Sequence, residues 1–230
     1  MRETVAGGPF PNAEGGMAWF NRMTRFGNFH SVYAQEAEDS CGIACVMMCV
    51  YKINKLSPNK EASYVEDQIY KVYGRQAHTS YNGSSYTYAE YLAATLNQLN
   101  CGAWQASYVG PNAVADAMVD TLGVDIVGGS ALANALMRGK PIITLVNWTD
   151  NGGGHFVVVD TVNNLLGSLY ASVCDPWDGD VHVVPFKQGT AFRYVGRQQP
   201  FAWDTGGKKH AYAADHAGGF NGWVVRPVSP

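Results

Sequence analysis

The sequence predicts an α+β fold, with a helical N-terminal half packed against an antiparallel sheet formed by the C-terminal half. Before about residue 140, apolar residues recur at the three- and four-residue spacing of helices. After it, short segments rich in Val, Ile, Thr and aromatic residues alternate with turn residues, as strands do. Because the two patterns occupy separate halves of the chain, the α+β class is favoured over an alternating α/β fold.

Five helices are expected in the first half of the chain. Residues 41–55 are apolar on almost every side, as in a buried central helix. Ser57 and Pro58 form a helix-start signal for a second helix that ends at Gly74. The other expected helices are 88–99, 112–122 and 130–138, the last with a Ser cap before it and Gly139 after it.

The second half predicts five strands, at 141–148, 155–162, 168–175, 181–186 and 222–228. Residues 31–230 are therefore expected to form one domain, with a helical lobe at about 31–139 and a sheet lobe at about 140–230. Residues 1–30 are Gly-rich and form an N-terminal arm or leader, for which an ordered arm, a flexible leader and a removable segment all stay open.

Composition excludes several classes of function. The 230 residues are 47% hydrophobic with a net charge of −3, typical of a globular protein. The basic stripe of a nucleic-acid-binding protein is absent, and the longest apolar run, 45–51, is too short to insert into a membrane. Residues 1–12 lack the apolar region of a Sec signal peptide, which predicts a cytoplasmic protein or one exported by a specialised secretion system. Oligomeric state is left open.

The five cysteines are expected to be free. Cys41, Cys45 and Cys49 are spaced four apart on one helix face, which is poor geometry for bridging them to one another. Small buried thiols in a reducing compartment fit this pattern better than a disulfide framework.

Cys41 is the candidate nucleophile. A polar segment runs directly into the apolar helix, so Cys41 falls in the first helical turn, where the helix dipole favours a thiolate. Asp39 and Ser40 are expected to help cap this helix. Gln35, six residues earlier, is placed to donate its amide, together with the Cys41 N–H, to a developing oxyanion. Gly42 leaves the approach to the sulfur open.

His155 is the candidate base, because three glycines precede it and a Val-rich strand follows. A hairpin loop centred on residue 165 would place Asp175 directly opposite His155, about 5 Å away at Cβ, where its carboxylate can orient the imidazole. This inference depends on the register of the hairpin. Asp175 is also expected to start a turn, since Pro follows it.

With these residues in order, the chain resembles the papain-like cysteine peptidases. The resemblance is to the bacterial branch that includes bacteriocin-leader peptidases, staphopains and secreted effector proteases. It covers roughly residues 35–186 and is carried by Gln35 with Cys41-Gly42 at a helix start, by the Gly-His-Phe-Val-Val-Val segment around His155, and by Asp175-Pro176. It implies a papain-like fold and a cysteine peptidase that acts on a protein or peptide substrate without cofactor or metal, with an effector or toxin as the implied biological role. It also implies that Gln35 serves the oxyanion hole and that Trp177 shelters the His–Asp hydrogen bond.

Other interpretations stay open beside this one. On the same fold, a thiol amidase, deamidase or transglutaminase would use the same acyl-enzyme, and a binding module without catalysis is a further alternative. His210 and His216 flank Asp215 without the spacing of a zinc site, so we interpret them as surface-loop residues. The tyrosines of residues 81–91 are expected as partly buried rings near a helix cap, with a substrate groove as the alternative.

Overall fold

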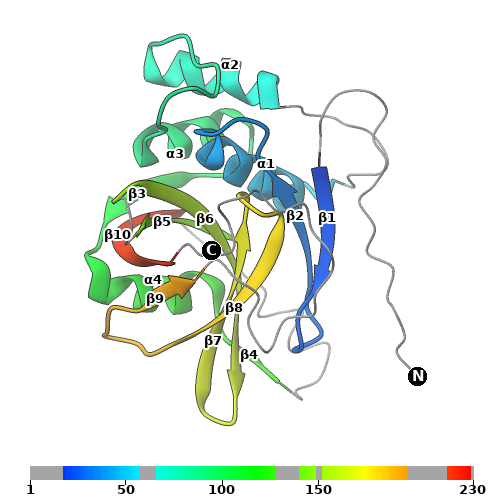
Figure 1. The fold of residues 1–230 in the computed structure, drawn as a ribbon, viewed down its shortest axis with the longest axis vertical. Helices are drawn as coiled ribbons and strands as arrows, with labels where there is room; N and C mark the ends of the chain where they lie inside the picture. Colours follow the sequence, from blue (N-terminus) through cyan, green and yellow to red (C-terminus); the bar gives the residue numbers. More distant parts are fainter. Residues whose placement is uncertain (1–17, 57–65, 128–139, 149–151, 196–216, 229–230) are drawn as a thin grey trace.

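The computed structural model describes residues 18–56, 66–127, 140–148, 152–195 and 217–228. Figure 1 shows helices α1, α2 and α3 stacked against one end of a large sheet, with strands β1 and β2 beside it and α4 apart from the other helices. The expected α+β class, with a large antiparallel sheet, is confirmed. No helix in the described ranges has the length and apolar character needed to cross a membrane.

Four of the predicted helices are present. The fifth, predicted at 130–138, lies outside the described residues. The helices are α1 (Cys41–Ile53), α2 (Glu66–Ala77), α3 (Ala89–Gln98) and α4 (Val114–Leu122), with a single 3-10 turn (η1, Pro111–Ala113) leading into α4.

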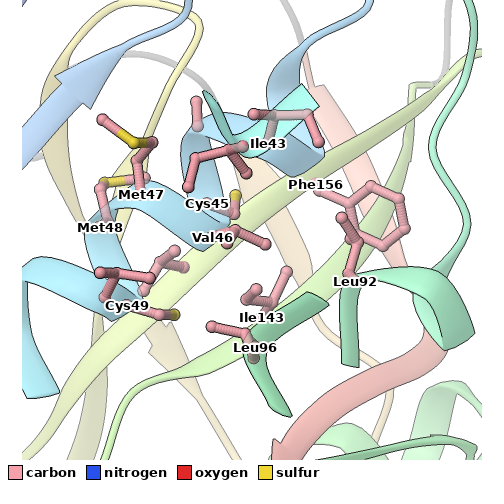
Figure 2. Packing of buried hydrophobic residues seen from close by; sticks show 14 of the residues in the cluster. Ile43, Cys45, Val46, Met47, Met48, Cys49, Leu92, Leu96, Ile143 and Phe156 are labelled. Carbon is pink, nitrogen blue, oxygen red and sulfur yellow. The ribbon is translucent and has the colours of Figure 1, made fainter. Parts of the chain in front are cut away.

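Helix α1 is buried on nearly all sides, as its composition predicted. Eleven of its thirteen residues, from Cys41 to Tyr51, are buried. Figure 2 shows its side chains packed in one cluster with Leu92 and Leu96 of α3 and Ile143 and Phe156 of the sheet. Each large apolar side chain buried in this way contributes about 1.5–3 kcal/mol. The five cysteines are free and buried, as expected.

The main path of the large sheet carries the strands predicted in the second half and adds one from the first half. Its main path runs β3 (Trp104–Tyr108), β10 (Ala217–Pro227), β5 (Ile142–Trp148), β6 (Gly154–Leu165), β7 (Ser168–Asp175) and β8 (Asp180–Phe186), with antiparallel neighbours throughout. Two short strands lie off this path: β4 (Asp125–Ile126) pairs parallel with β6, and β9 (Arg193–Val195) pairs antiparallel with β10. Strand β3 was not predicted because Trp104 is its one fully buried residue, so it shows little alternation.

A hairpin near the N-terminus crosses the boundary predicted at residue 30. Strands β1 (Ala18–Met23) and β2 (Phe29–Ala34) pair antiparallel. The fully buried Arg22 ties the hairpin to the sheet, because its Nε lies 3.1 Å from Asp180 Oδ1 on β8. Of the alternatives left open for residues 1–30, residues 18–30 therefore form an ordered part of the domain.

The turn between β6 and β7 is not centred on residue 165, as the sequence had suggested. Leu165 pairs with Ser168, so the loop consists of Leu166 and Gly167, and both have positive φ (51° and 88°). This is the two-residue hairpin loop that suits the twist of the strands. The predicted register was therefore wrong, because leucine in the left-handed region is not a turn signal that composition reveals.

A β-bulge at Asp160 restores the predicted facing of the site residues. Val159 pairs with Val173 but Thr161 pairs with Ser172, so Asp160 is an extra residue on β6. The numbers of two residues paired between β6 and β7 add up to 333 near the turn, as for Leu165 and Ser168. Beyond the bulge they add up to 332, as for Val159 and Val173. Since side chains alternate along a strand, only the even sum places His155 and Asp175 on the same face.

Two hydrophobic cores cover the two faces of the sheet. The first, which we call the helix-side core, contains α1 with Phe156, Val158 and Cys174. The second, the α4-side core, contains α4 with residues of the same strands that point the other way, including Val157 and Val173. The candidate site lies where the two cores meet, at the ends of β6 and β7.

Candidate active site

Cys41 is the first residue of α1 and is 8% exposed. Backbone N–H groups in a first helical turn have no partner within the helix, and the helix dipole adds partial positive charge there. Ser40 occupies the N-cap but makes no side-chain bond to this turn. Its hydroxyl lies instead 3.0 Å from Ala37 O and 3.3 Å from Glu66 Oε1. The expected capping by Ser40 is therefore wrong, which leaves the turn free to stabilise a thiolate or an oxyanion.

Gly42 has a different role from the one expected. A Cβ at this position would stand 2.1 Å from Thr87 Oγ1 and 3.1 Å from Leu92 Cδ1. The absent side chain therefore allows the segment before α3 to pack directly against the residue that follows Cys41. This close approach brings Thr87 and Tyr88 to the site.

His155 lies beside the sulfur, at the start of β6. The two residues interact directly, since a hydrogen bond with Cys41 is among the interactions that raise the pKa of His155. The N–H of Phe156, the next residue, also points at Cys41 Sγ, over 3.5 Å. The end of β6 therefore supports the thiol through both a side chain and the backbone.

Asp175 ends β7, and its carboxylate is hydrogen-bonded through both oxygens. Oδ1 lies 2.7 Å from His155 Nε2 and accepts the backbone N–H of Trp177 over 2.8 Å. Oδ2 accepts the hydroxyl of Tyr194 on β9. Because Nε2 of His155 is bound to Asp175, Nδ1 is the ring nitrogen left for Cys41.

The electrostatics of the pair favour imidazolium and carboxylate together. Burial lowers the pKa of His155, but the charge and hydrogen bond of Asp175, together with Cys41, outweigh burial and raise it well above its ordinary value. Burial raises the pKa of Asp175, and the charge and hydrogen bond of His155 outweigh this and lower it. A protonated His155 beside Cys41 is the arrangement that stabilises a thiolate.

Two tryptophans cover the imidazole. Trp148, at the end of β5, stacks on His155 with ring centroids 5.0 Å apart and planes inclined by 21°. Trp177 meets the same ring edge-on, at 6.0 Å and 82°. Trp177, which the family resemblance pointed to, is thus beside the His–Asp bond, while Trp148 covers the face of the ring.

A cavity of about 510 Å³ opens onto the sulfur and the imidazole. The loop before α1, the segment before α3 and the glycines before His155 form its walls. Tyr86 and Tyr88 are 68% and 60% exposed there, whereas Tyr81 is buried. Tyr81 is thus a buried ring, as expected, while Tyr86 and Tyr88 line this cavity. The lining residues are Glu38, Asp39, Cys41, Tyr86, Thr87, Tyr88, Leu145, Trp148, Gly152, Gly153, Gly154, His155, Phe156 and Trp177.

Gln35 is not among the residues that line this cavity. It is 2% exposed, and its Nε2 donates to Ala37 O and Glu38 O, both over 2.8 Å. The amide thus fixes the loop that leads into α1. The structure brings Cys41, His155 and Asp175 together but engages Gln35 with its own loop, so a role in the oxyanion hole would need the amide to turn.

The sequence did not indicate two residues of the site, Tyr194 and Trp148. It also did not indicate the carboxylate partners of two other histidines. His182 Nε2 lies 2.8 Å from Asp178 Oδ2, and His30 Nδ1 lies 2.5 Å from Asp160 Oδ2. Both tyrosine and tryptophan in strands are usual core residues, so only the fold shows that these two reach a functional group. Asp178 lies in the turn between β7 and β8 and His182 lies on β8, so this contact spans only four residues of the chain.

Two groups of side chains have the residue types of metal ligands. His30, Asp160 and Cys174 form one, and Asp175, Asp178 and His182 form the other. In the first, Lys52 already contacts the Asp160 carboxylate, and in the second, both carboxylates are bound to histidines. Ion pairs and hydrogen bonds therefore explain both groups. His210 and His216 lie outside the described residues.

Neither a protein-family model nor a curated protein matches the chain.

Proposed function

We propose that this protein is a papain-like cysteine peptidase that hydrolyses peptide bonds through an acyl-enzyme. Cys41 is the nucleophile, His155 the acid and base, and Asp175 the residue that orients the imidazole. The observation that supports this most is the chain of contacts from Cys41 to His155 to Asp175 at the wall of an open cavity. Burial of all three side chains protects these contacts from competing water.

The geometry suits a two-step transfer. The Cys41 thiolate attacks the carbonyl carbon of the substrate, and the carbonyl oxygen becomes an oxyanion beside the uncapped first turn of α1. His155 then gives its Nδ1 proton to the amine, the C–N bond breaks, and a thioester remains on Cys41. In the second step, His155 takes a proton from water, which attacks the thioester and releases the carboxylic acid and the thiol.

The test is the pH dependence of Cys41 alkylation by iodoacetamide, with the labelled residue mapped by mass spectrometry. We expect rapid, selective labelling of Cys41 well below about pH 8.5, where a free thiol ionises, and loss of this reactivity in His155→Ala. The buried Cys45, Cys49, Cys101 and Cys174 are internal controls. Slow labelling that the substitution leaves unchanged would show that Cys41 and His155 do not act together.

The substrate bond is tested separately, because an acyl-enzyme can form from many amides. Casein, a glutamine-containing peptide with an added amine, and muropeptides are compared as substrates of the parent and of Cys41→Ala. Chain cleavage of casein that the variant lacks supports the peptidase. Ammonia release without cleavage would identify a deamidase or transglutaminase, and inert behaviour with all three would favour a binding module.

A further inference from the structure

The charges around the cavity are one-sided. Glu38 and Asp39 line it beside Cys41 and His155, and among the residues that the structure describes no Lys or Arg lines it. Glu38 is exposed and Asp39 half-buried, and in the described part of the chain neither carboxylate pairs with a cation. Both residues bond the rest of the protein through their backbones, Glu38 to Gln35 and Asp39 to Tyr81.

These carboxylates lie close to the candidate nucleophile. Asp39 is two residues from Cys41, so the two Cα atoms are at most about 7.6 Å apart. A cationic group bound in the cavity would neutralise negative charges that no Lys or Arg of its described lining compensates.

The aromatic wall favours the same kind of group. Tyr86 and Tyr88 are the most exposed rings of the cavity. Tyr88 is the N-cap of α3, and the packing of Thr87 against Gly42 fixes the segment that carries both tyrosines. Tyrosine faces attract lysine and arginine side chains through cation–π interactions. Carboxylates beside exposed tyrosines form a surface that suits a long basic side chain with an apolar stem.

We propose that Glu38 and Asp39, together with Tyr86 and Tyr88, select substrates that carry a lysine or arginine side chain next to the bond that is cleaved. This proposal rests on the proposed function, since it assigns a substrate class to the same cavity. Thr87 also lines this wall and is only 8% exposed. In the described ranges its hydroxyl has no hydrogen-bond partner.

The charge preference is measured on the thiol itself. Methanethiosulfonate reagents transfer a thioalkyl group to a thiolate. A mixed disulfide forms on the cysteine and methanesulfinate leaves, so no added oxidant is needed. The rates of Cys41 modification are compared for a trimethylammonium-bearing reagent, a sulfonate-bearing reagent and the neutral methyl reagent. In Glu38→Gln/Asp39→Asn we expect the ratio of cationic to anionic rates to fall about tenfold at low salt, and less at 0.5 M salt, where screening is strong.

The matched control is Asp67→Asn/Asp120→Asn, which removes the same net charge at exposed helix positions that do not line the cavity. The control should keep the parent ratio. An equal ratio in parent, variant and control would overturn the proposal.

A second arm connects this result to catalysis. Cleavage sites in casein are mapped for the parent and for Glu38→Gln/Asp39→Asn, and enrichment of Lys and Arg near the parent's sites should be lost in the variant. Cleavage without any basic preference would refute this proposal and leave the peptidase standing. Absence of cleavage, with a charge-dependent reagent ratio, would refute the peptidase and leave the cation-binding cavity standing.

Discussion

The Asp175 carboxylate is held by Tyr194 as well as by His155. The Tyr194 hydroxyl holds the oxygen that His155 does not use, and the ring is fully buried between Trp148 at 6.0 Å and His182 at 5.7 Å. Strand pairing fixes this arrangement, because Gly218 on β10 pairs with Trp148 on one side and with Tyr194 on the other. The carboxylate is thereby prevented from rotating away from the imidazole.

We expect Tyr194→Phe to raise the pKa of Asp175 by about one pH unit. A hydrogen bond to a charged group is worth about 1.5–3 kcal/mol, and its loss penalises only the ionised form. Carbon NMR of the Asp175 carboxyl measures this shift, and Cys41 labelling should slow several-fold at neutral pH. The control is Tyr33→Phe, which removes another buried hydroxyl, bound to Glu36 Oε1 over 2.8 Å, and should leave the Asp175 titration unchanged. An unshifted Asp175 in Tyr194→Phe would show that the hydroxyl is not needed.

At the scale of elements, the bulge in β6 decides whether the site can form. Asp160, the extra residue, is held by Lys52 of α1 and by His30 of β2, so a helix and the N-terminal hairpin both support it. Burial raises the pKa of Asp160, but the charge of Lys52 and the hydrogen bond and charge of His30 outweigh this and lower it. The ion-paired Asp160 carboxylate thus stabilises the bulge, and the bulge determines on which face of the sheet the His155 side chain lies.

Deleting Asp160 should abolish the pH-dependent reactivity of Cys41 even in folded protein, because His155 and Asp175 would then lie on opposite faces of the sheet. Asp160→Asn keeps the residue count, so it should lower stability, by about 3 kcal/mol for a broken buried ion pair, while the labelling profile is retained. Circular dichroism confirms folding of both variants. A deletion variant that labels like the parent would contradict the role of the bulge.

The bulge also shows how far the sequence could lead. Cys41, His155 and Asp175 were predicted because a thiol at a helix start, a histidine after glycines and an aspartate before proline each carry a local chemical signal. The register that joined the last two was wrong, since neither the Leu166–Gly167 turn nor the extra Asp160 has a distinctive composition. The prediction that His155 and Asp175 lie on the same face of the sheet remained correct, because the predicted and observed sums of paired residue numbers, 330 and 332, differ by an even number. Tyr194 could not be predicted, as its role exists only once β9 pairs with β10.

For the whole molecule, the buried His155–Asp175 pair links stability to pH. The raised pKa of His155 means that its contribution is complete below the unfolded value of 6.5 and is lost as pH rises through about 10. The lowered pKa of Asp175 means that its contribution is present above 3.8 and is lost as pH falls through about 2. Both statements describe one interaction, seen from its two partners.

The free energy of unfolding of the parent should therefore exceed that of Asp175→Asn most between about pH 4 and 6.5, by about 3 kcal/mol for a buried pair that loses one partner. The difference should shrink as pH rises towards 10. Urea unfolding across this range measures it, with Asp120→Asn as an exposed control that shows no such trend. A difference that stays constant with pH would mean that the pair is not charged in the folded protein.

The boundary between the two cores has a consequence for heat inactivation. Cys41 belongs to the helix-side core, while Trp148 and Tyr194, which hold His155 and Asp175, belong to the α4-side core. A slight movement of α1 over the sheet would part the thiol from the imidazole and leave the His155–Asp175 bond intact. On warming, Cys41 should therefore lose its reactivity before the protein unfolds, and on cooling it should regain it. The temperature at which reactivity is lost should lie below the unfolding temperature.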